Sequence, residues 1–325
     1  MSTGEGGPDE SRKDATNGAE PRISRVASRI EAHIPPAWRR PRRLLILAAL
    51  VVVIVLVIIT RPATTPSHPA PGTTVFGVGN QVMLRFVHSA GSVHVSAGPA
   101  GQVRITEHRN GITSAIHTHY RQQGNVITVT VSIENGLYTA TWVDFNVAVP
   151  QDASANVAVA AGTLDATGLD GNVALHDSNG SIWANNVRGA IAMQTTSGSI
   201  NTDRVNGQVS ASTDNGTITS TATHLNGRSL VQARSGTINF HGSVDPGSHA
   251  TFRNTNGATG ITLARGSSVL VSARTPLGSI NSQFPSVHVV DNSNGRVADG
   301  RVGQGAPGRL SIETKGGSIA LNHGG

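Results

Sequence analysis

A glycine followed two residues later by a branched aliphatic side chain recurs every nine residues through the middle of the chain. The glycines are Gly162, Gly171, Gly180, Gly189, Gly198, Gly207 and Gly216, and the aliphatics are Leu164, Val173, Ile182, Ile191, Ile200, Val209 and Ile218. The residues before the glycines alternate between an apolar corner, such as Val205-Asn206-Gly207, and a polar one, such as Ser197-Gly198. The full repeat is therefore 18–20 residues long and has two unlike halves. A fixed period of this length is typical of a solenoid.

Each half-repeat predicts a short strand and a tight corner. Glycine adopts the positive φ of such a corner without steric cost, and alternation along the strand turns the aliphatic side chain inward. Coils stacked about 4.8 Å apart would place Ile200 between Ile182 and Ile218, with Ser, Thr, Asn and Gln facing outward. We therefore expect an all-β fold in which residues 151–325 form a β-solenoid similar to a parallel β-helix, with 18–20 residues and two strands per coil. The alternative is an antiparallel meander with a hairpin every nine residues, which the Asn-Gly pairs would suit.

Residues 75–150 alternate over longer segments, such as NVITVTVSI and TATWVDFNVAVP. These segments predict an antiparallel β section that caps one end of the solenoid, because an open terminal coil exposes unpaired backbone groups. At the other end, the last coil finishes at residues 321–325 with no recognisable cap. We therefore expect copies of the chain to self-associate through this edge of the solenoid.

The most apolar stretch is LLILAALVVVIVLVII at residues 44–59, followed by Thr60. It predicts a transmembrane helix over residues 44–60. The twenty residues before it contain six arginines, whereas the twenty residues after it contain only Arg61. The positive-inside rule then places the N-terminus in the cytoplasm and the C-terminal domain outside the cell. We expect a single-pass plasma-membrane protein held by an uncleaved signal anchor.

The segments on either side of this helix are polar. Residues 1–43 are charged and Gly-rich, which predicts a disordered cytoplasmic tail. Within this tail, Ile23, Val26, Ile30 and Ile34 recur at helical spacing among arginines. Residues 22–34 are therefore interpreted as a short basic amphipathic helix on the inner leaflet, the alternative being a continuation of the disordered tail. Residues 61–74 are rich in Pro, Thr and Ser and predict a semi-rigid linker.

Composition excludes several classes of protein. The 325 residues include 38 glycines but only three Trp, two Tyr and six Phe, so the core must be built from small branched side chains. Cysteine is absent, which excludes disulfides and thiolate metal sites. The net charge of +6 divides equally between residues 1–43 and 61–325. No basic stripe interleaved with aromatic residues is visible in the sequence, so we expect no nucleic-acid partner.

Two patterns of residues suggest a metal ion. His117 and His119 lie on one face of a predicted strand, near Glu107 and His108, and zinc would accept such ligands. Histidines two residues apart on a solvent-facing strand are more typical of a plain surface, so we expect no metal there. Glycines nine residues apart also occur in calcium-binding rolls, but those repeats need an aspartate in every turn. Here Asp177, Asp203 and Asp214 lie at unrelated phases.

Signs of catalysis are weak. Thr213-Asp214-Asn215 resembles one serine-hydrolase motif, but no Ser-x-x-Lys precedes it. Carboxylates and aromatic rings are sparse beyond residue 160, which disfavours a glycan-active enzyme. We therefore expect a non-enzyme with no catalytic, cofactor-binding or metal-binding residues and no cofactor.

The order of these features resembles one bacterial family. The segment Phe145–Pro150 reads FNVAVP and precedes tandem NGxV and SGSI-like half-repeats at Asn172–Val173, Gly180–Ile182, Gly198–Ile200, Gly207–Val209 and Gly216–Ile218. Over residues 75–325 the chain resembles the DUF4097 family, whose members are labelled putative adhesin domains. The resemblance implies a β-solenoid at the bacterial cell envelope and supplies no catalytic residue to carry over.

We therefore expect a membrane-anchored bacterial surface protein whose extracellular β-solenoid has an adhesin-like, structural or binding role. Its partner would be a cell-wall, glycan or protein ligand. The alternative is an envelope-stress sensor or regulator that relays an extracellular binding event to the basic segment at residues 22–34. A glycan-active enzyme is the third hypothesis.

Overall fold

The computed structural model describes residues 72–134 and 141–324, which are built almost entirely from β-strands. The one helix in these ranges is the single 3₁₀ turn η3, Thr113–Ala115, and no helix there is long and apolar enough to cross a membrane. The predicted cytoplasmic tail (residues 1–43) and transmembrane helix (residues 44–60) lie outside the described residues. Most of the predicted linker (residues 61–74) also lies outside them, and its last two residues already belong to the first strand.

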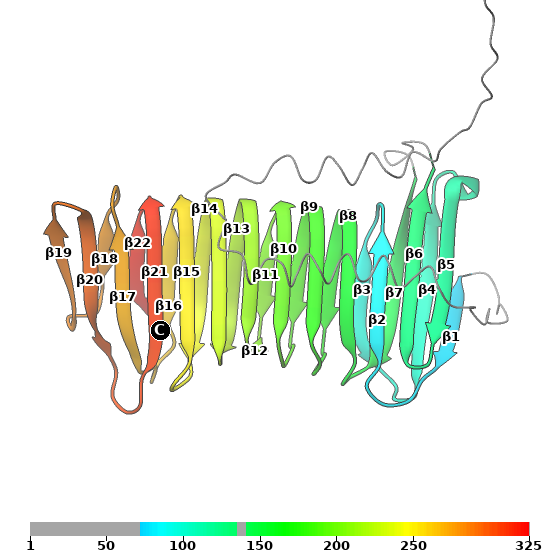
Figure 1. The fold of residues 1–325 in the computed structure, drawn as a ribbon, viewed down its shortest axis with the longest axis horizontal. Helices are drawn as coiled ribbons and strands as arrows, with labels where there is room; N and C mark the ends of the chain where they lie inside the picture. Colours follow the sequence, from blue (N-terminus) through cyan, green and yellow to red (C-terminus); the bar gives the residue numbers. More distant parts are fainter. Residues whose placement is uncertain (1–71, 135–140, 325) are drawn as a thin grey trace, which may run out of the picture. The chain divides into compact units, whose positions relative to one another are not determined.

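The described strands join into one 22-stranded sheet (Figure 1). The strands are β1 Thr73–Gly77, β2 Met83–His88, β3 Val93–Gly98, β4 Gln102–Asn110, β5 Ile116–Gln123, β6 Val126–Ile133, β7 Trp142–Pro150, β8 Ser154–Thr167, β9 Val173–Asn185, β10 Ile191–Ser197, β11 Ile200–Asp203, β12 Asn206–Gly207, β13 Val209–Leu225, β14 Arg228–Val244, β15 His249–Asn256, β16 Thr259–Leu263, β17 Val269–Thr275, β18 Ile280–Ser282, β19 Val287–Asn292, β20 Gly295–Val302, β21 Gly308–Gly316 and β22 Ile319–His323. The longest strands, such as β13 and β14, each contain both halves of one repeat.

The central strands, β8 to β14, pair in parallel. Strand β11 aligns Ile200 with Ile182 of β9 and with Ile218 of β13, so equivalent side chains of successive coils form a column. Between β13 and β14, Ile218 pairs with Ile238, and the register then shifts at a bulge between Ser220 and Thr223. Parallel pairing is confirmed for these strands, and the antiparallel meander is wrong for them.

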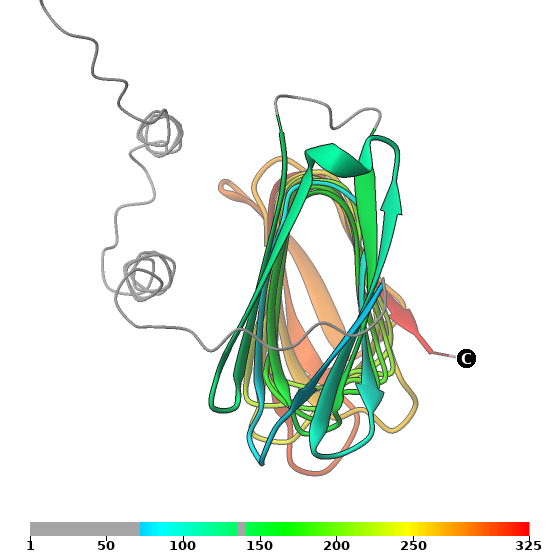
Figure 2. The same cartoon turned by 90° about the vertical axis from the view of Figure 1, so that its right-hand side faces the viewer.

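The interior between the two sides of the coils is narrow. Figure 2 shows the central coils lying one behind another, with a sheet on each side. Ile182, Ile200 and Ile218 point inward and are 0 % exposed. Burying one such side chain contributes about 1.5–3 kcal/mol, and the column repeats this contribution in every coil. Small branched residues therefore form the core here, as the scarcity of aromatic residues predicts.

The glycine of the polar corner is required by contact between coils. A Cβ atom on Gly198 would lie 1.7 Å from the carbonyl oxygen of Gly180 in the preceding coil. A Cβ atom on Gly216 would lie equally close to the carbonyl oxygen of Gly198. The φ of Gly198 is also +149°, a conformation that residues with a side chain rarely adopt. The repeat therefore keeps its spacing because successive corners touch through their backbones.

The N-terminal end is not wound in sequence order. Strands β2 and β3 form a coil that pairs in parallel with β6 and β7 on one side and with β8 on the other. Phe86 of this inserted coil packs against Phe145 of β7, with ring centroids 4.8 Å apart. Antiparallel pairing joins β1 to β4, β4 to β7 and β5 to β6. The predicted antiparallel section at residues 75–150 is therefore corrected to a mixed one, because β2 and β3 join the stack of parallel coils.

The C-terminal end has the same kind of insertion. Strands β21 and β22 pair in parallel with β15 and β16 on one side and with β17 and β18 on the other. The hairpin of β19 and β20 adds antiparallel to β17 and lies at the end of the stack (Figure 1). The last strand is therefore internal, and the open C-terminal coil expected from the sequence is wrong. Self-association of the chain stays a prediction, but an open C-terminal coil no longer supports it.

Candidate binding surface

The outward side chains form straight rows across the central coils. Asp165, Trp183, Asn201, Thr219 and Asn239 occupy equivalent positions on β8, β9, β11, β13 and β14. The other side of the coils carries a similar row made of Ala158, His176, Gln194, Ser212 and Gln232. Successive members of a row are about 4.8 Å apart, the spacing of paired strands. These rows can offer regularly spaced hydrogen-bonding groups to an extended ligand.

Two arginines on the central coils are paired with acids of the neighbouring coil. Arg188 lies 3.3 Å from Asp170, and Arg234 lies 3.3 Å from Asp214. Exposed ion pairs of this kind contribute only about 0–1 kcal/mol each. Their larger effect is to cancel the charge of these arginines, so the outer surface of the central coils is locally neutral.

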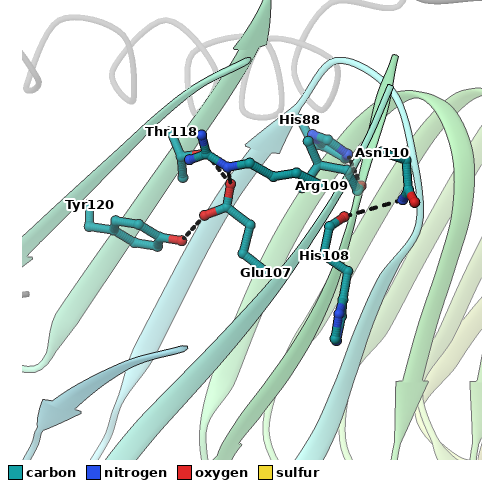
Figure 3. Close-up of polar contacts among 8 residues, drawn as sticks. His88, Glu107, His108, Arg109, Asn110, Thr118 and Tyr120 are labelled. Carbon is teal, nitrogen blue, oxygen red and sulfur yellow. Dashed lines mark hydrogen bonds and ion pairs between the residues drawn. The ribbon is translucent and has the colours of Figure 1, made fainter. Parts of the chain in front are cut away.

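A polar cluster around Glu107 joins β4 to β5 (Figure 3). The Oε1 atom of Glu107 accepts hydrogen bonds from Thr118 Oγ1 at 2.9 Å and from Arg109 Nε. Its Oε2 atom accepts one from the Tyr120 hydroxyl at 2.9 Å. Burial and the adjacent carboxylate raise the pKa of Tyr120, so the phenol keeps its proton and remains a donor. Both oxygens of Glu107 are thus engaged within the cluster.

The residues considered as zinc ligands do not converge. His117 Nε2 lies 2.7 Å from Oε1 of Glu134, and the ring of His108 is directed away from Glu107 (Figure 3). His119 is exposed on β5. Within residues 72–134 and 141–324, no three or more His, Cys, Asp or Glu side chains are grouped to hold a metal ion.

Two histidines connect the inserted β2–β3 coil to its neighbours. His88 is 2 % exposed, and its Nε2 donates to the carbonyl of Val143 at 2.8 Å. Burial lowers the pKa of His88, which favours the neutral ring. His94 Nδ1 lies 3.0 Å from Asp165 Oδ2, and this hydrogen bond raises the pKa of His94. One histidine thus ties the inserted coil to β7 and the other ties it to β8.

The sequence did not reveal a row of polar side chains inside the stack. Asp177, Thr195, Thr213, Asn254 and Thr314 lie three residues before a corner glycine and are at most 3 % exposed. Each has one side-chain oxygen with no hydrogen-bond partner among the described residues. Burial raises the pKa of Asp177 to about 6. The signal was present at each polar corner, but Ser and Thr occur on both faces there, so alternation did not identify the inward position.

The three aspartates considered for calcium are separated by this arrangement. Asp177 lies inside the stack, whereas Asp203 and Asp214 face outward and each pairs with an arginine. The Thr213-Asp214 corner is divided in the same way, since Thr213 is buried. These residues form neither a calcium cage nor a hydrolase site.

The fold and its rows define an all-β protein of stacked parallel coils with extended polar faces. No family model and no curated protein matches the chain. Among solved structures, a putative adhesin from Bacteroides fragilis is 11% identical with a TM-score of 0.41, covering 77% of this chain and 95% of that chain. A putative adhesin from Parabacteroides merdae is 12% identical with a TM-score of 0.35, covering 77% and 95%. A putative cell adhesion protein from Clostridium sporogenes is 10% identical with a TM-score of 0.30, covering 78% and 100%. Likenesses at this level carry no information about ligand or activity.

Proposed function

We propose that this chain is a non-catalytic, adhesin-like binding protein of the bacterial surface, whose coils form a β-solenoid that presents flat faces to an extended ligand. The supporting observation is the register of the outward rows, in which Asn201, Thr219 and Asn239 repeat at strand spacing. A ligand with repeating polar groups can contact several coils at once, and linked weak contacts raise the overall avidity. The DUF4097-like half-repeats support membership of that family.

The proposed anchor is the apolar segment at residues 44–60. The arginines that precede it support a cytoplasmic N-terminus and an extracellular C-terminal domain in the plasma membrane. In this arrangement the Pro-rich linker before β1 holds the coils away from the membrane.

Protease treatment of intact cells tests this topology. The full chain is expressed with one epitope at each end, and the cells are treated before and after lysis. We expect the C-terminal epitope to be lost from intact cells and the N-terminal one to survive until lysis. Survival of the C-terminal epitope on intact cells would overturn the proposed location.

Deleting residues 2–34 separates adhesion from sensing, because it keeps the four arginines next to the anchor, at positions 39, 40, 42 and 43. We expect cells with this deletion to attach to surfaces as well as cells with the full chain. Attachment that persists while a transcriptional response to the surface disappears would favour the sensor. Loss of attachment itself would contradict an adhesive role carried by the coils.

A further inference from the structure

We propose that the outer face of β14, β15, β21, β17 and β20 binds an acidic polysaccharide. The proposal rests on the binding role argued above and names the chemical class of the ligand. It follows from a set of exposed basic side chains that the insertion of β21 brings together.

The five strands β14, β15, β21, β17 and β20 follow one another in the stack (Figure 1). Arg228 pairs in register with His249, His249 with Arg309, Arg309 with Leu270, and Leu270 with Arg301. All five side chains are exposed. We call this set the basic row. Four strand steps of about 4.8 Å give it a length of about 19 Å.

The arginines of the basic row lack the acidic partners that Arg188, Arg234 and Arg253 have. On the same sheet, Arg253 Nε lies 2.9 Å from Glu313 Oε2. Among the described residues, Arg228, Arg309 and Arg301 make no ion pair, and Arg301 donates to a backbone carbonyl. Arg228, Arg309 and Arg301 are two strand steps apart along the row, or about 9.6 Å. A polyanion lying along the row would supply, at this regular interval, the acidic partners that the fold does not provide.

A hollow of about 470 Å³ lies on the basic row. It is lined by His249, Leu270 and Arg309 of the row, and by Ser272 and Ser311 on the neighbouring row. The carboxylate of Asp299 also lines it. This combination suits a sugar ring that carries an acidic group. Leu270 can contact the apolar face of the ring, Arg309 can bind its carboxylate or phosphate, and the two serines and Asp299 can bind ring hydroxyls.

The same surface is poorly suited to nucleic acid. Single-stranded nucleic acids are held by aromatic platforms on which bases stack. The exposed apolar member of the basic row is Leu270, and the nearby ring of Phe252 is buried at 1 % exposure. Charge without stacking therefore favours an acidic glycan over nucleic acid.

Binding of the purified full-length chain to immobilised polygalacturonate tests the proposal, with dextran as the neutral glycan and single-stranded DNA as the competing polyanion. We expect polygalacturonate to bind, with an affinity that falls as salt rises, and dextran and DNA to bind much more weakly. In the triple variant R228Q/R309Q/R301Q, the affinity should fall about tenfold or more and depend less on salt, because three ionic contacts are lost.

The matched control is R188Q/R204Q/R234Q, which removes the same charge from arginines that are paired with acids on the central coils. We expect its affinity to be unchanged. An equal loss in both triple variants would mean that net charge alone binds the polymer, and equal binding of DNA would overturn the glycan class.

The fold of each variant is checked by thermal unfolding. Arg309 is exposed and makes no ion pair among the described residues, so R309Q should be as stable as the parent chain, and R309K should keep most of the binding. A chain that reaches the cell surface but does not bind polygalacturonate would refute this inference alone. The topology experiment above would still decide the proposed function.

Discussion

The central coils and the two ends are built from the same strands but are ordered differently. In the centre, each coil stacks on the one that follows it in sequence, as Ile182, Ile200 and Ile218 show. At the ends, the neighbours are distant, since Met83 pairs with Ser154 in one insertion. Closing longer loops adds little entropic cost, because that cost rises only with the logarithm of loop length. A regular stack can therefore accept a distant segment wherever its register matches.

The ends also stop the stack from growing. Antiparallel strands cover each terminal coil, β1 and β4 at one end and β19 and β20 at the other. A parallel coil with a free edge would offer its backbone to another chain. The central coils provide repeating surface, and the ends provide closure.

The largest predicted effect comes from shifting the register between coils in the centre of the stack. Deleting residues 191–208 removes one complete coil and brings Val209 into the register that Ile191 has with Val173. We expect this variant to fold with one coil fewer, with thermal unfolding and circular dichroism close to those of the parent chain. Deleting residues 191–207 instead puts the next coil out of phase and reverses its inward and outward faces, so it should abolish cooperative unfolding. Equal behaviour of the two variants would contradict strict register between coils.

Truncation after Gly305 tests the ends. It removes β21 and β22, which separate β15 and β16 from β17 and β18. We expect hydrogen exchange measured by mass spectrometry to accelerate across β15 to β20 and to stay slow across β8 to β13. Unchanged protection of β17 and β18 would show that they restack directly on β15 and β16.

A single methyl group should test the contact between corners. Gly198→Ala places a Cβ 1.7 Å from the carbonyl of Gly180, so we expect a loss of about 3–5 kcal/mol in the free energy of unfolding. The control is Gly247→Ala, where φ is +74° but no atom lies within 4 Å of the new Cβ. Its cost should be about 1 kcal/mol, from the backbone conformation alone. Chemical denaturation measures both, and equal costs would refute the backbone contact.

The smallest predicted effect concerns Asp177 and depends on pH. Burial raises its pKa from 3.8 to about 6, so the folded state binds the proton more tightly than the unfolded state. The favourable contribution of protonated Asp177 to the free energy of unfolding is fully present below pH 3.8 and is lost as the pH rises through about 6. This difference corresponds to roughly 3 kcal/mol at most. Asp177→Thr matches Thr195 in the next coil, and we expect it to be more stable than the parent chain at pH 8 and similar at pH 4. A constant difference at both pH values would contradict an ionised, buried carboxylate.

The sequence predicted the central coils well because their information is local. The period, the inward aliphatics such as Ile200 and the corner glycines all recur from one coil to the next, and parallel stacking follows from them. The two insertions could not be predicted in this way. Residues 83–98 and 308–323 pair with segments that are distant in sequence, and no periodic signal marks the partners.

The candidate site was missed for the same reason. Arg228 and His249 lie on adjacent strands, but more than fifty residues separate His249 from Arg301 and Arg309 in the sequence. The two pairs become one row because β21 enters between β15 and β17. The buried row of Asp177 and Thr195 was missed for a local reason, since small polar residues occupy both faces of the polar corner.

The place of β22 has a consequence for how the molecule is made. During translation, β17 and β18 are synthesised before β21 and β22, the strands that separate them from β15 and β16 in the folded protein. The nascent C-terminal half must therefore wait, with apolar side chains such as Ile261 and Ile280 uncovered, until residues 319–323 emerge. A chain stopped before residue 319 would therefore carry a finished centre and an end with apolar side chains still exposed.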